Sequence, residues 1–100
     1  MLSHRSGAAL SQIRQSDSRV IDVTVPSRAG RIRRKGIRVH RSGRLTAEEV
    51  TVIDGIPVMT VARTLLDLAD DLDLQALRRA ITEAEYRNLF DLTALNAVVN

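Results

Sequence analysis

Residues 55–70 read GIPVMTVARTLLDLAD, and this stretch decides the fold. Thr60 belongs to the residue types that cap the N-termini of helices, because its side-chain oxygen can accept a free backbone N–H. The apolar residues after it recur three or four positions apart, which is the spacing of one helix face; they are Val61, Leu65, Leu68 and Leu72. The stretch therefore predicts a capped helix that ends near residue 70.

A hairpin is expected directly before this helix. Asp54 and Gly55 form the pair most favoured in a two-residue type I′ turn, so they predict that strands 49–53 and 56–59 are joined by it. Pro57 cannot donate a ladder hydrogen bond. The second strand of the hairpin is therefore expected to be irregular or to lie at a sheet edge.

Two further strands are predicted upstream. Residues 20–25 alternate, with Ile and Val on one face and Asp and Thr on the other. In residues 36–41 the apolar side chains are expected to point inward, whereas Arg38 and His40 point outward. The segment between the two strands, residues 27–35, is interpreted as a basic loop or a hairpin connection.

Three more helices complete the pattern. Ser3 can cap a short helix to about residue 13, Asp73 a helix to about residue 88, and Asp91 a third, C-terminal one. The order of elements predicts one α+β domain over residues 1–100. We expect a small antiparallel sheet of three or four strands, an N-terminal helix at one end and a C-terminal layer of three helices.

Composition narrows the class of protein. The 100 residues contain no cysteine, which excludes disulfides and thiolate zinc sites. No apolar run reaches the roughly 18 residues that a membrane span needs. We expect a cytoplasmic protein that uses no cofactor and does not enter a membrane.

Positive charge is concentrated in the first half of the chain. Eleven of the 15 Lys and Arg residues lie within the first 45 residues, against two of the 12 Asp and Glu. Arginine forks suit backbone phosphates, and no aromatic residue is interleaved for base stacking. The alternative is a solvated loop that pairs with the acidic C-terminal half. The candidate nucleic-acid-binding residues are Arg28, Arg31, Arg33, Arg34, Lys35, Arg38 and Arg41.

No catalytic or metal-binding constellation is expected. A magnesium nuclease needs two acids and a Lys held together, but the only lysine, Lys35, has Arg33 where an acid would stand. His4 and His40 lie on different elements, and neither has a second ligand at metal-binding spacing. We interpret His4 as a polar contact at a helix cap and His40 as a solvated strand residue.

One family resemblance rests on the opening stretch. Residues 55–70 are similar to the hallmark segment of the AbiEi-type antitoxin family, where a Gly-Ile-Pro-Val turn and a Thr precede an Ala-Arg-Thr-Leu-Leu-Asp-Leu-Ala helix. Residues 2–10 resemble the family's Ser-His-x-Ser-Ala-Ala helix. The resemblance marks four residues as structural or partner-facing: Thr60, Arg63, Thr64 and Asp67. Arg63 and Asp67 fit a partner surface, an ion pair on the helix surface or a buried anchor.

The resemblance implies a function. In the family a winged helix-turn-helix that binds operator DNA precedes this domain, and in a related group a nuclease-like module akin to very-short-patch repair endonucleases follows it. This chain matches the shared domain alone, so it is expected to be shortened relative to both. The implied function is a non-catalytic module of a bacterial toxin–antitoxin system or transcriptional regulator. It would bind nucleic acid, and a protein partner or a second copy through its C-terminal helices. The alternatives are the detached targeting half of a nuclease-related protein, without nuclease chemistry, and a decayed gene fragment.

Overall fold

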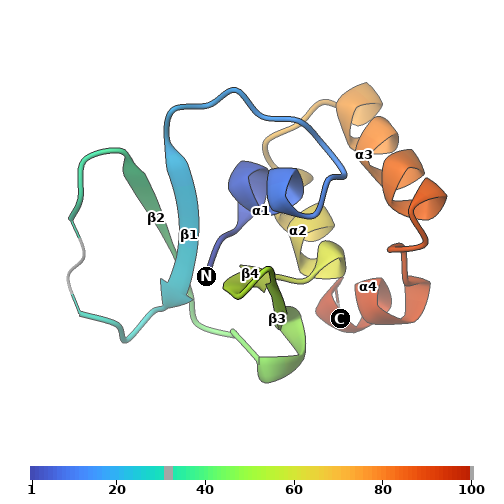
Figure 1. Ribbon diagram of the computed structural model, residues 1–100. Coiled ribbons are helices and arrows are strands. Elements are labelled where there is room, and N and C mark those ends of the chain that lie inside the picture. The colour runs from blue at the N-terminus through green and yellow to red at the C-terminus, as the bar shows by residue number, and fades with distance from the viewer. Residues whose placement is uncertain (31–32, 100) are drawn as a thin grey trace.

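The computed structural model describes residues 1–30 and 33–99, which form an α+β fold (Figure 1). Helices lie at the start and at the end of the chain, and the strands lie between them. The elements in chain order are α1 (His4–Leu10), β1 (Ile21–Pro26), β2 (Ile37–Ser42), the 3-10 turn η1 (Ala47–Glu49), β3 (Val50–Ile53), β4 (Ile56–Met59), α2 (Val61–Leu68), α3 (Leu74–Tyr86) and α4 (Leu92–Val99). The expected N-terminal helix and three C-terminal helices are confirmed, but α1 ends at Leu10 and not near residue 13, and the Ser3 side chain makes no capping hydrogen bond.

The strands form two pairs, so the expected antiparallel sheet of three or four strands is wrong. β1 and β2 are parallel, with Ile21 opposite Ile37, whereas β3 and β4 are antiparallel. The hairpin interpretation of the basic connection is therefore also wrong, since a parallel pair needs a crossover. Residues 27–36 can span about 35 Å when extended, enough to return along a strand of about 20 Å. The alternation of apolar and polar residues along a strand does not indicate whether its neighbour runs parallel or antiparallel to it.

The first three residues join the two pairs of strands. The Leu2 N–H donates to the Pro57 carbonyl at 3.0 Å, and the Leu2 carbonyl accepts from the Met59 N–H at 2.9 Å. On the other side, the Ser3 N–H donates to the Asp22 carbonyl at 3.0 Å. β1 and β4 are thereby connected through a short segment that belongs to neither of them.

The hairpin turn adopts the expected conformation. Asp54 and Gly55 have φ angles of 51° and 77°, the positive values that a type I′ turn requires at both central positions. β4 covers the predicted residues, and its other edge contacts Leu2. The local sequence signal at this turn was therefore sufficient to place the hairpin.

The three C-terminal helices begin where their caps were expected. Thr60 Oγ1 accepts the Arg63 N–H at 3.4 Å, and the Asp73 carboxylate accepts the Ala76 N–H at 2.8 Å. The Asp91 carboxylate accepts the Ala94 N–H at 3.0 Å. Each cap satisfies an N–H that has no partner within its helix.

The core lies between helices, and α1 has a more central place than expected. α1 lies between β1 and α2 and not at one end of the sheet (Figure 1). Small side chains on α1 and α3 let these helices approach α2 closely. The main cluster of buried apolar side chains consists of Ala8, Ile13, Leu65, Leu68, Ala80 and Ala84, and Val58, Met59, Ala62 and Ala76 are also buried.

In the described part of the chain, no helix combines the length and the apolar character that a membrane crossing requires.

Candidate functional site

The basic connection between β1 and β2 is open to solvent where the structure describes it. Arg28, Arg33, Arg34 and Lys35 are all exposed. Across residues 1–30 and 33–99, the ion pairs involve none of these four side chains. Arg31, also a predicted binding residue, lies outside the described residues. The connection therefore offers several positive charges to a ligand.

Arg41 has a different role from the rest of the predicted set. Its guanidinium donates to the carbonyls of Ala29 at 2.8 Å and Gly30 at 3.1 Å. These bonds tie the end of β2 to the start of the basic connection. Arg41 therefore orders this connection and is less free to reach a phosphate.

Arg38 is exposed but contacts a polar cluster centred on the buried carboxylate of Asp22. The carboxylate of Asp22, although buried, lies 3.8 Å from Arg38 Nη1 and 3.0 Å from His40 Nε2. The Asp22 N–H donates to Ser6 Oγ at 2.9 Å. Asp22 thus links β1, β2 and α1, and it positions the exposed Arg38 beside the connection.

His40 is not the solvated strand residue that was expected. Its side chain is only 27% exposed, and its ring stacks on that of His4 with centroids 3.7 Å apart. His4 Nδ1 lies 3.0 Å from Ser3 Oγ, which agrees with the expected polar contact at the start of α1. The sequence did not predict this stack, because the stack depends on the parallel register of β1 and β2. That register places His40 opposite Thr24, on the face of β1 that also carries Asp22.

Burial lowers the pKa of His4, because the protonated ring loses hydration. The nearby His40 acts in the same direction, while Asp67 and Asp22 oppose the shift only in part. The neutral form of His4 is therefore favoured in the folded chain.

We expect the free energy of unfolding to decrease as the pH falls below the ordinary His pKa of 6.5. The unfolded chain then binds a proton at His4 more readily than the folded chain does, so protonation favours unfolding. The loss begins near the unfolded pKa and levels off below the folded one. Thermal unfolding between pH 5 and 8 would measure it. His4→Asn should flatten this part of the profile, since Asn does not titrate and tolerates the φ of 51° at this position. An unchanged profile in that variant would contradict the assignment to His4.

Arg63 connects three elements through its guanidinium. Nε contacts Asp67 Oδ1 at 3.0 Å, Nη1 pairs with Glu49 Oε2, and Nη2 donates to Ser42 Oγ at 3.4 Å. The side chain is 15% exposed, and those of Glu49 and Asp67 are each 10% exposed. Burial alone would lower the pKa of Arg63, but the hydrogen bonds to both carboxylates outweigh it and raise that pKa. Of the three interpretations of this pair, the geometry matches the buried anchor.

Of the other two residues that the family resemblance marked, Thr64 faces inward, whereas Thr60 is only partly buried. Thr64 is fully buried, and its hydroxyl donates to the Met59 carbonyl at 3.5 Å. A Cβ placed at Gly7 of α1 would lie 3.4 Å from Thr64 Oγ1, so the two helices are in close contact there. Thr60 caps α2. Arg63 and Thr64 therefore hold α2 against its neighbours, while Asp67 pairs with Arg63 and Thr60 caps the helix.

Within the part of the chain that the structure describes, no group of three or more His, Asp or Glu side chains is placed to hold a metal ion. A comparison with models of known protein families found no match, and a comparison with curated proteins found no similar sequence either.

Proposed function

We propose that this chain is a non-catalytic binding module of the antitoxin and regulator kind, which contacts the phosphate backbone of nucleic acid through its basic connection. The observation that carries the proposal is the exposed group Arg28, Arg33, Arg34 and Lys35 on a segment held between two parallel strands. Phosphate contacts require only such positive side chains and supply most of the affinity for nucleic acid at low salt.

The distribution of ion pairs supports this interpretation over a solvated loop that pairs with the acidic half. Arg63 forms ion pairs with Glu49 and Asp67, and Arg87 forms one with Glu83. These acids are thus engaged by arginines of their own half of the chain. In the described residues, the only ion pair from an acid to the Arg-rich segment is the contact of Arg38 with Asp22 of β1.

A protein partner is proposed at the opposite side of the fold, on α4. This helix packs against α2 but buries none of its described residues fully, and Leu92 and Val99 are 60% and 61% exposed. The two side chains are seven positions apart and so share one face of α4, and contiguous exposed apolar surface marks protein contacts. The family resemblance agrees with a module that regulates by binding and has no chemistry of its own, although in that family DNA is bound by a domain that precedes this one.

The test is the salt dependence of binding to a fluorescently labelled DNA duplex, followed by anisotropy. We expect the double variant Arg33→Gln, Arg34→Gln to reduce the slope of log K against log salt by about 2, because each lost phosphate contact removes about 0.9. The matched control is Arg5→Gln, Arg78→Gln, which removes the same charge from exposed positions on α1 and α3.

The control should retain the slope of the unmodified chain. An equal loss in both double variants would show that only net charge matters, and the proposed interface would be wrong. Magnesium-dependent cleavage of the duplex would contradict the non-catalytic part of the proposal.

A further inference from the structure

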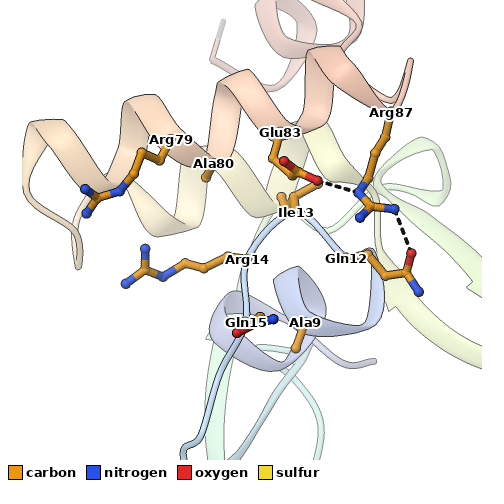
Figure 2. Close-up of a pocket in the computed structure, with 9 residues that line it drawn as sticks. All are labelled: Ala9, Gln12, Ile13, Arg14, Gln15, Arg79, Ala80, Glu83 and Arg87. Atoms are coloured by element: carbon orange, nitrogen blue, oxygen red, sulfur yellow. Dashed lines mark hydrogen bonds and ion pairs between the residues drawn. The ribbon is translucent and has the colours of Figure 1, made fainter.

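A second basic site lies away from the connection, in a groove between α3 and the segment that follows α1 (Figure 2). Its volume is about 580 Å³, within the range of small-molecule sites. Ile13 and Ala80, both buried, contribute the apolar part of the lining. In Figure 1, α3 and the β1–β2 connection occupy opposite sides of the molecule, so the groove is separate from the nucleic-acid surface proposed above.

Three arginines and one glutamate line this groove, and the glutamate is already engaged. Glu83 Oε1 accepts from Arg87 Nε at 2.7 Å, and Arg87 Nη1 donates to Gln12 Oε1 at 2.9 Å. Figure 2 shows this pair at one end of the groove. The lining therefore keeps an excess of positive charge that its own acid does not neutralise.

The excess charge resides on Arg14 and Arg79, which come from segments far apart in the sequence. Figure 2 shows both side chains extending toward the same side, away from the Arg87–Glu83 pair. In the described residues, neither guanidinium takes part in an ion pair or a side-chain hydrogen bond. Two like charges on one groove repel each other unless an anion lies between them.

We propose that this groove binds a small phosphorylated molecule, with Arg14 and Arg79 donating to its phosphoryl oxygens. A phosphoryl group carries more than one negative charge and several acceptor oxygens, which suits two guanidinium groups better than a single carboxylate does. Ile13 and Ala80 offer apolar contact to the remainder of the ligand. The lining has no aromatic side chain, so selection acts on the phosphoryl group and not on a stacked base.

The experiment follows amide chemical shifts during titration with pyrophosphate, with potassium chloride at equal ionic strength as the reference. We expect saturable shifts at residues that line the groove. Arg14→Gln and Arg79→Gln should each weaken binding about tenfold or more, because each removes charge-assisted hydrogen bonds. Arg78→Gln is the matched control, since Arg78 is exposed on the same helix but does not line the groove.

Three outcomes would overturn the proposal. The first is shifts that do not saturate, and the second is equal weakening in the Arg78→Gln control. The third concerns the source of the phosphoryl group: if Arg14→Gln weakens binding of a DNA duplex as much as that of pyrophosphate, the groove belongs to a nucleic-acid surface and not to a small ligand. Failure of the DNA experiment described above would leave this groove unaffected, because the two sites share no residue.

Discussion

Replacing Arg63 with Met is expected to lower the free energy of unfolding by about 3–5 kcal/mol, the usual loss when one partner of a buried ion pair is removed. Glu49 and Asp67 would remain largely buried without their common cation. Asp67 already has one oxygen, Oδ2, that is buried without a hydrogen-bond partner in the described structure. Urea unfolding followed by circular dichroism measures the change as a lower midpoint at constant slope.

Two further variants test whether this loss of stability comes from the buried ion pairs of Arg63. Arg63→Met combined with Glu49→Gln should recover part of the stability, since one of the two stranded carboxylates becomes neutral. Arg78→Met, at an exposed position on α3, should change stability by no more than about 0.5 kcal/mol. A loss below about 1 kcal/mol for Arg63→Met would mean that the guanidinium lies on the surface and does not anchor α2.

Replacing Leu68 with Ala is expected to lower the free energy of unfolding by about 3–5 kcal/mol, through lost apolar burial and a residual cavity. Leu68 is fully buried, and it shares the core with Ala8, Ala80 and Ala84. Alanine side chains cannot rotate to fill the vacated volume, so the cavity should persist. Thermal and urea unfolding measure the loss.

Leu74 is the matched control for this substitution. It begins α3 but is 64% exposed, so Leu74→Ala should change stability by less than about 1 kcal/mol. Similar losses for the two leucines would show that the core does not lie where the helices place it.

The helices and the hairpin were predictable because their signals are local. Thr60, Asp73 and Asp91 accept N–H groups three positions further along the chain. The type I′ turn depends only on Asp54 and Gly55. Interactions over such short distances leave a residue pattern that the sequence displays directly.

Strand pairing was not predictable in the same way, because it depends on contacts between residues that are far apart in the sequence. The alternation of side chains along β1 is the same whether its neighbour is parallel or antiparallel. It also does not indicate that Leu2 pairs with both Val23 and Val58. The expectation that apolar side chains point inward and polar ones outward was also wrong for His40. The face of β1 that carries Asp22 and Thr24 is buried, whereas Ile21 is largely exposed.

For the candidate site, the sequence identified the residue types but not their surroundings. The exposure of Arg28, Arg33 and Arg34 could be read from charge alone, because arginine side chains are mostly exposed unless an ion pair buries them. The contacts of Arg63 with Glu49 and Ser42 could not be read, because η1 and β2 reach α2 only through the tertiary fold. The groove with Arg14 and Arg79 was missed for the same reason.

The place of residues 1–3 between β1 and β4 affects how the chain folds while it is being synthesised. These residues are synthesised before their partners in β4, which ends at Met59. At about 5–20 residues per second, the ribosome needs about 3–12 s to deliver them. Until then the backbone groups of Leu2 that pair with β4 in the folded chain stay open to other nascent chains, and such edges promote aggregation. Conditions that slow translation should therefore lower the yield of folded protein.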